Sequence, residues 1–211
     1  MKNVDDLIEG AKELSERGFS RGEISDELNV SRETASWLVE RSDTSVTPTE
    51  TSGGPQDIHV DWNALGRDSA RLTYTGMAMA DLLSKQGEAV DLTVGVEKAG
   101  VPLATVVAQE LDTDIAAYAP RKHQWEEGDL DEHQGTFSQN FADIRDRECY
   151  VVDDTITSGT TMTETIQSIT ERGGEPVACV VLVDKQGIDE LDGVPVYSLI
   201  QAIRVGNADS H

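Results

Sequence analysis

Two adjacent carboxylates and a group of hydroxyl side chains are concentrated near position 155 of this 211-residue chain. The stretch from Tyr150 to Thr161 reads YVVDDTITSGTT, in which an apolar run enters two aspartates and a turn rich in Thr, Ser and Gly opens a helical pattern. Backbone N–H groups and hydroxyls at a helix N-terminus bind phosphate, and paired carboxylates accept hydrogen bonds from sugar hydroxyls. A merely well-capped turn would need neither feature, so the pattern indicates a phosphorylated sugar as ligand. The predicted ligand-binding residues are Asp153, Asp154, Thr155, Thr157, Ser158, Gly159, Thr160 and Thr161.

A parallel sheet is needed to position these side chains. After residues 61–85, an amphipathic segment that predicts one or two helices, apolar runs alternate with helical patterns. Such alternation is typical of a parallel sheet covered on both faces, whose ligands bind beyond the carboxyl ends of the strands. We predict strands over 92–96, 115–118, 148–153, 177–183 and 194–199, and helices over 102–111 and 160–172.

A separate helical pattern precedes the sheet. The first helix carries apolar residues at i, i+4 and i+7, counted from Leu7. Ser20 and Glu23 form a capping box at the start of a second helix, and Ser31 caps a third. The segment Gly22–Val39, GEISDELNVSRETASWLV, resembles the DNA-binding helix-turn-helix of bacterial and archaeal regulators. In that motif the last helix lies in the major groove, and its N-terminal residues reach base edges.

This resemblance implies contacts with double-stranded DNA. Arg32 is able to pair with a guanine, Ser36 with bases or phosphates, and Arg21 with a phosphate. The alternative is a helical interaction domain whose charges are only solvated, because the piece to Asp43 has 6 basic and 11 acidic residues. The expected DNA-contacting residues are Arg21, Ser31, Arg32, Glu33, Thr34, Ser36 and Trp37.

The aspartate-rich stretch resembles the phosphoribosyl-pyrophosphate (PRPP) motif of type I phosphoribosyltransferases. The resemblance covers about residues 58–199 and is greatest to the orotate phosphoribosyltransferases. It implies Mg²⁺ together with a pyrophosphate ligand, whereas DNA binding requires no cofactor, and we assign no metal ligands. It also implies a pyrophosphate loop and three further ligand contacts, which fall on Glu97, Lys98, Ala99 and Gly100, and on Arg121, Lys122 and Lys185.

Two departures from that pattern argue against catalysis. Ala99 stands where the orotate enzymes have a lysine, and Lys98 is one place early. The stretch 123–135, where those enzymes carry a cationic mobile loop, holds no lysine or arginine. Transfer needs cations near the leaving pyrophosphate, but this stretch holds five carboxylates, Glu126, Glu127, Asp129, Asp131 and Glu132.

The whole layout resembles the orotate-phosphoribosyltransferase-like regulators of haloarchaea, which act on sugar-degradation genes, and more distantly the purine operon repressors of Gram-positive bacteria. It implies an α/β fold, in which an N-terminal helix-turn-helix is joined to a phosphoribosyltransferase-like domain with a parallel sheet flanked by helices. The expected function is transcriptional regulation in response to PRPP or another phosphorylated sugar metabolite, by a cytoplasmic homodimer. The alternative is an active, Mg²⁺-dependent phosphoribosyltransferase that makes a nucleotide from orotate or a purine.

Composition divides the chain and limits its location. Residues 44–57, TSVTPTETSGGPQD, are a linker by composition, so we expect a DNA-binding domain over 1–43 and a ligand-binding domain over 58–211. No apolar stretch is long enough to span a membrane, and no secretory signal is present. Cys149 and Cys179 lie in apolar runs, which predicts buried, inert thiols.

The strongest compositional feature is the net charge of −23, from 40 acidic and 17 basic residues. It argues against a polybasic nucleic-acid or membrane binder, and a dense acidic surface with few lysines is typical of proteins from salt-loaded cytoplasms. The 37% of hydrophobic residues lie in periodic runs, which argues against disorder.

Overall fold

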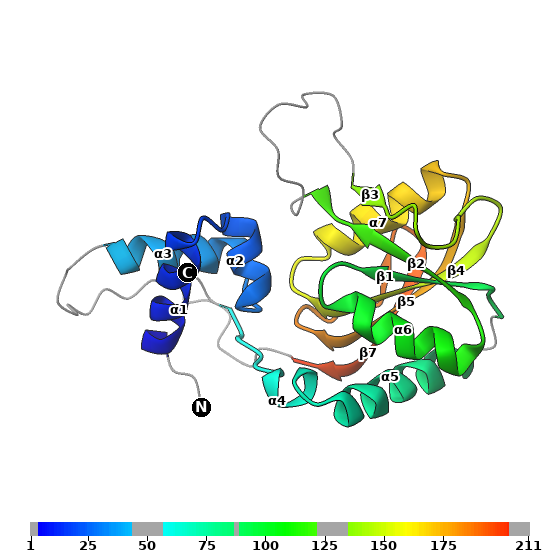
Figure 1. Ribbon diagram of the computed structural model, residues 1–211, viewed down its shortest axis with the longest axis horizontal. Helices are drawn as coiled ribbons and strands as arrows, with labels where there is room; N and C mark the ends of the chain where they lie inside the picture. Colours follow the sequence, from blue (N-terminus) through cyan, green and yellow to red (C-terminus); the bar gives the residue numbers. More distant parts are fainter. Residues whose placement is uncertain (1–3, 44–56, 87–88, 122–134, 203–211) are drawn as a thin grey trace, which may run out of the picture. The chain divides into compact units, whose positions relative to one another are not determined.

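The computed structural model describes residues 4–43, 57–86, 89–121 and 135–202 (Figure 1). The chain divides into two compact units, Met1–Trp62 and Asn63–His211. No helix in the described ranges has the length and apolar character needed to cross a bilayer. The described elements are α1 (Val4–Glu16), α2 (Arg21–Glu27), α3 (Arg32–Asp43), α4 (Asn63–Gly66), α5 (Ser69–Ser84), β1 (Leu92–Val96), α6 (Gly100–Leu111), β2 (Asp114–Ala119), β3 (Thr136–Phe137), β4 (Glu148–Ile156), α7 (Thr160–Glu171), β5 (Glu175–Asp184), β6 (Glu190–Leu191) and β7 (Val194–Gln201).

The N-terminal unit is the predicted helix-turn-helix with a supporting first helix. The capping box at α2 is present, since Ser20 N donates to Glu23 Oε2 at 2.9 Å and Glu23 N donates to Ser20 Oγ at 3.2 Å. Asn29 turns the chain between α2 and α3 with a φ of 51°, a conformation that Asn tolerates better than most residues. The buried core of this unit consists of Leu7, Ala11, Leu14, Ile24, Leu28, Val30, Ala35, Leu38 and Val39.

The C-terminal unit is a seven-stranded sheet in the order β3-β2-β1-β4-β5-β7-β6. The five central strands are parallel, while the two-residue strands β3 and β6 pair antiparallel at the edges. Figure 1 shows α5 and α6 on one face and α7 on the other. Alternate strand residues pack toward these two layers, for example Val151 toward α7 and Val152 toward α5 and α6.

The predicted strands and helices are all present, with small differences at their ends. The amphipathic segment 61–85 forms two helices, because the chain turns at Arg67 and the Asp68 side chain caps the second by accepting from Arg71 N at 3.0 Å. The strands β3 and β6 were not predicted, because two residues carry no detectable alternation. Both thiols are buried, and burial raises the pKa of Cys149 to about 12.

The two units divide between Trp62 and Asn63. Asp57 and His59 form hydrogen bonds to residues of the helix-turn-helix. Most of the predicted linker, residues 44–56, lies outside the described residues.

Candidate functional site

The candidate ligand site lies where the strand order of the sheet reverses. From β1 the chain passes through α6 to β2 on one side, and from β4 it passes through α7 to β5 on the other. The strands β1 and β4 are neighbours, with Gly95 paired to Val152, and the helices that follow them lead to strands on opposite sides. Such switch points are the usual ligand sites of parallel sheets. Both predicted loops, Glu97–Gly100 and Asp153–Thr161, begin there.

The two aspartates occupy the exit of β4. Asp153 is buried and Asp154 is half-buried. Asp153 Oδ1 accepts a hydrogen bond from Asp154 N at 2.8 Å, and Asp154 Oδ2 accepts one from Thr155 Oγ1 at 3.1 Å. These contacts fix the orientation of both carboxylates, as a site for vicinal hydroxyls requires.

The turn after β4 presents the N-terminus of α7. Gly159 precedes the helix with a φ of 79°, a conformation in which a residue with a side chain is strained. Because Gly159 has no side chain, it does not cap the helix. Ser158 Oγ contacts Thr160 Oγ1 at 3.0 Å, and both side chains are exposed. The uncapped first turn and its hydroxyls are suited to an anion, which the helix dipole also favours.

The pyrophosphate-type loop packs directly against the aspartate pair. A Cβ added to Gly100, the first residue of α6, would lie 2.5 Å from Val152 O and 2.9 Å from Asp153 Cα. Glu97 N donates to Tyr118 O at 2.8 Å, and the Glu97–Lys98 peptide bond is cis. Lys98 is exposed, and Ala99 precedes α6 without capping it. The two predicted loops thus belong to one site.

We predict that Gly100→Ala lowers the thermal midpoint by several degrees, because overpacking of a tight contact costs about 1–3 kcal/mol. Gly10→Ala is the matched control, since its Cβ would meet only Leu28 Cδ2, at an ordinary 3.5 Å, and alanine in a helix is favoured by about 0.5–1 kcal/mol. Thermal unfolding of both variants in molar KCl measures the difference. Equal midpoints would contradict the close approach of the two loops.

A third segment, following β5, contacts the turn after β4. Asp184 is 1% exposed, and its carboxylate accepts hydrogen bonds from the backbone N–H groups of Gln186, Gly187 and Ile188 at 2.7–3.0 Å. Gln186 Nε2 donates to Thr157 O at 2.6 Å, and buried Lys185 donates its N–H to Ile156 O at 3.0 Å. Lys185, a predicted ligand contact, is thus hydrogen-bonded through its backbone to the strand that precedes the turn. Asp184 and Gln186 were not predicted.

Glu164 joins the exit of β2 to α7. Its Oε1 accepts hydrogen bonds from Tyr118 Oη and Arg121 N, both at 2.9 Å, and Tyr118 Oη also contacts Ser168 Oγ at 2.9 Å. Burial is the main cause that raises the pKa of Tyr118, which keeps this hydroxyl protonated as a donor. Exposed Arg121 is held at the sheet edge by this contact, whereas predicted Lys122 and the acidic loop Glu126–Glu132 lie outside the described residues.

The candidate DNA interface comprises the start of α2 and the outer face of α3. Arg21, Arg32 and Glu33 are exposed and Ser36 is half-buried. Two of the predicted residues are engaged in the cap of α3, since Ser31 Oγ accepts from Thr34 N at 3.1 Å and Thr34 is buried.

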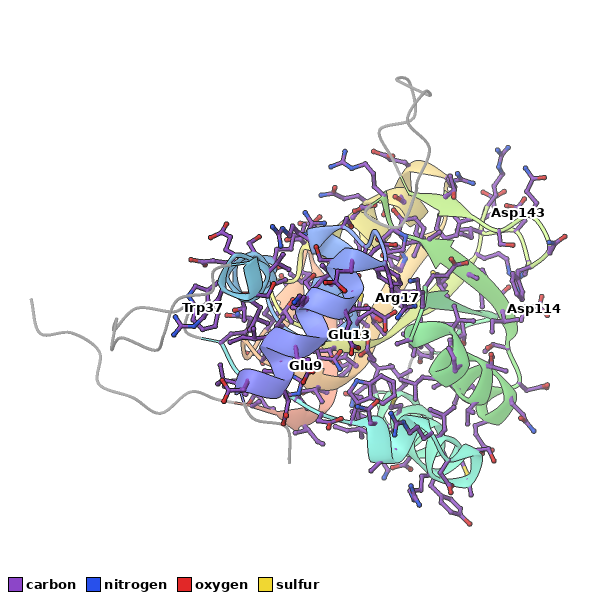
Figure 2. All side chains as sticks on the ribbon, turned by 60° about the vertical axis from the view of Figure 1, so that its left-hand side comes forward. Glu9, Glu13, Arg17, Trp37, Asp114 and Asp143 are labelled. Carbon is purple, nitrogen blue, oxygen red and sulfur yellow. The ribbon has the colours of Figure 1, made fainter. Side chains whose placement is uncertain are left out.

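Predicted DNA contact Trp37 is partly buried. Figure 2 labels it on α3, where it packs against the core of the unit and Arg41 lies 5.1 Å above its ring. Ser36 and Trp37 are both half-buried, so the exposed members of the predicted set are Arg21, Arg32 and Glu33.

Known proteins are similar to this chain over nearly its full length. The transcriptional regulator GfcR of Haloquadratum walsbyi is 70% identical over 209 residues, covering 97% of this chain and 95% of that protein. The transcriptional regulator GfcR of Methanocella arvoryzae is 45% identical over 215 residues, covering 99% of this chain and all of that protein.

Solved structures share the fold of the C-terminal unit. Orotate phosphoribosyltransferase of Mycobacterium tuberculosis in complex with PRPP matches with a TM-score of 0.52 and 20% identity, over 67% of this chain and 80% of that one. Adenine phosphoribosyltransferase of Thermoanaerobacter pseudethanolicus matches with a TM-score of 0.55 and 19% identity, over 69% and 88%. The sequence profile of the phosphoribosyl transferase domain matches residues 61–207. The chain belongs to the GfcR family of transcriptional regulators and contains a domain of the phosphoribosyl transferase family.

Proposed function

We propose that this regulator binds a phosphorylated sugar metabolite, PRPP or another sugar phosphate or sugar acid phosphate, at the switch point of the sheet. In response, it changes its binding to a DNA operator of sugar-degradation genes. The observation that carries this proposal is that buried Asp153 is followed, one turn later, by the N-terminus of α7, which no side chain caps. The carboxylate suits sugar hydroxyls, and the uncapped helix N-terminus suits a phosphate.

The proposed ligand contacts come from four segments that lie at or follow the carboxyl ends of the strands β1, β2, β4 and β5. The carboxylates orient the sugar, the turn before α7 binds its phosphate, and the loop before α6 binds a second anionic group. A ligand with a pyrophosphate group would bring Mg²⁺ with it, because that cation prefers phosphate and carboxylate oxygens. The contacts are Asp153, Asp154, Thr155, Thr157, Ser158, Gly159, Thr160 and Thr161, with Glu97, Lys98, Ala99 and Gly100, and with Arg121, Lys122 and Lys185.

The proposed DNA contacts lie at the start of α2 and at and after the cap of α3. They are Arg21, Ser31, Arg32, Glu33, Thr34, Ser36 and Trp37. A homodimer would place two such helices in successive major grooves, about 34–36 Å apart. A ligand shifts this arrangement only as far as it binds the two states with different affinities. Since the operator is chromosomal DNA, we place the protein in the cytoplasm.

The experiment that tests this function combines ligand binding with turnover. Thermal shift in molar KCl, with PRPP and a panel of sugar phosphates, is expected to raise the midpoint for at least one compound, because a ligand stabilises the state it binds. An assay with PRPP, Mg²⁺ and orotate, adenine, guanine or hypoxanthine is expected to yield no nucleotide. Robust nucleotide formation would instead support the transferase, and no shift with any compound would exclude the proposed sensor.

A further inference from the structure

The six residues Asp57–Trp62, here termed the strap, contact the turn of the helix-turn-helix within the N-terminal unit. Asp57 Oδ2 accepts a hydrogen bond from Ser31 N, and His59 Nδ1 lies 2.8 Å from Leu28 O. With the Asn29 amide oriented to satisfy its neighbours, its oxygen accepts from Trp62 Nε1 at 3.2 Å. Three strap residues thus bind the segment between α2 and α3.

The contact of Asp57 supplies a group that the sequence of α3 lacks. The N–H of a cap residue is satisfied by a carboxylate at the third helical position, as Glu23 does for Ser20 at 2.9 Å. In α3 the third position is Thr34, and its glutamate, Glu33, is one place early. Asp57, 26 residues away, takes over this role, so the N–H of the cap residue Ser31 is satisfied by the strap and not by the first turn of α3.

His59 binds the other end of the turn. Leu28 closes α2 as its C-cap residue, and a helix end leaves carbonyl oxygens in need of donors. The His59 ring supplies one through Nδ1, while its Nε2 is enclosed by protein atoms. The strap therefore holds the C-terminus of α2 and the N-terminus of α3 together.

The strap is also directly continuous with the ligand-binding unit. Trp62 is its last residue and Asn63 is the first residue of α4. Both α3 and the strap belong to the N-terminal unit.

We infer that Asp57, His59 and Trp62 are positioning residues for the recognition helix, and that the strap ties the ligand-binding unit to that helix without an intervening linker. This inference rests on the proposed DNA binding. It makes the join at Trp62–Asn63 the place where a change in the ligand-binding unit reaches the DNA-contacting residues.

The first test compares two substitutions that remove the same charge. Asp57→Asn keeps an oxygen acceptor for Ser31 N, whereas Asp57→Ala does not. With an operator selected from random DNA by the unaltered full-length protein, we expect Asp57→Ala to bind about tenfold more weakly and Asp57→Asn to remain within about threefold. Glu9→Gln removes a charge from the exposed side of α1 (Figure 2) and controls for reduced repulsion of DNA, which alone would tighten binding. Equal affinities of the two Asp57 variants would overturn the positioning role.

Hydrogen exchange gives a readout that needs no operator. We expect the Ser31 amide to exchange at least tenfold faster in Asp57→Ala than in Asp57→Asn, while the buried amides of β4 exchange at unchanged rates. Faster exchange throughout α1–α3 in the alanine variant would mark unfolding of the unit. The role of the strap would then be tested by the operator affinity and the Ser31 exchange rate of Asp57→Asn and His59→Ala. An unchanged exchange rate of the Ser31 amide in Asp57→Ala would overturn the inference that Asp57 satisfies this amide. Failure of the unaltered protein to select any DNA, with Ser31 behaving as expected, would reject the proposed function and not the strap.

The second test lengthens the tie. Gly-Ser-Gly-Ser inserted between Trp62 and Asn63 leaves the strap intact but separates it from α4, while the same insertion between Thr51 and Ser52 leaves both intact. We expect the first insertion to abolish the preference for one half-site spacing, so that operators altered by 2–4 base pairs, roughly a third of a helical turn, bind within about threefold of one another. We expect the second to retain the preference. Identical spacing preferences of the two insertion variants would overturn the inference that the strap connects the ligand-binding unit to the recognition helix.

Discussion

Replacing Asp153 and Asp154 together by asparagine is expected to abolish the metabolite response and to leave operator binding intact. Hydrogen bonds to charged acceptors contribute about 1.5–3 kcal/mol each, so the loss of both carboxylates predicts an affinity decrease on the order of a hundredfold or more. Asparagine keeps an oxygen where Asp153 accepts from Asp154 N, so the exit of β4 retains its local contacts. The effect is therefore expected at the ligand and not at the fold.

Calorimetry or thermal shift with the compound that best stabilises the unaltered protein measures this loss, and an operator titration measures DNA binding. Asp112→Asn is the matched control, because Asp112 is exposed in the same unit and its φ of 54° is readily adopted by asparagine. A metabolite response retained in the double variant would show that the sensor lies elsewhere.

The fold could be predicted because its signals are local. The strand β1 and the beginning of α7 at Thr160 were predicted to the residue, since an apolar run and a glycine-marked helix start are both legible in a few consecutive positions. Gly100 meets Asp153 because parallel strands place their carboxyl ends at one edge of the sheet, but this contact was not itself predicted.

What could not be predicted depends on contacts between distant positions. Glu164 binds Arg121 N across 43 residues, and Asp57 binds Ser31 N across 26. A single carboxylate on an amphipathic helix or in a polar segment carries no sign of its partner. Composition likewise cannot show that Asp57 and His59 bind the turn between α2 and α3.

Charge makes the DNA-binding half unusual. The first forty-three residues carry a net charge of −5 and the remainder carries −18. A net-acidic protein gains little affinity from counterion release, and at molar salt the repulsion of phosphates is screened within a few ångströms. Binding must then depend largely on contacts with base edges, and among the proposed contacts Arg32 is the best placed to make them.

Arg32→Ala is therefore expected to weaken operator binding about 10- to 100-fold, because a bidentate arginine–guanine pair discriminates by about 1–3 kcal/mol. Arg32 is exposed at the first position of α3, which is capped by Ser31 and Asp57, so removal of its side chain leaves the helix intact. The loss should be confined to one base-pair position of the operator, where the variant no longer distinguishes sequences.

Fluorescence anisotropy with the operator and its single-base variants, in molar KCl, measures this loss. Arg21→Ala is the comparison, because a phosphate contact supplies affinity without sequence preference, so its removal should weaken all sequences alike. Ligand affinity of the C-terminal unit should not change in either variant. If Arg32→Ala lost operator binding and metabolite binding equally, the cause would be misfolding. If Arg32→Ala bound every operator variant with the affinity of the unaltered protein, the outer face of α3 would not be the surface that recognises the DNA sequence.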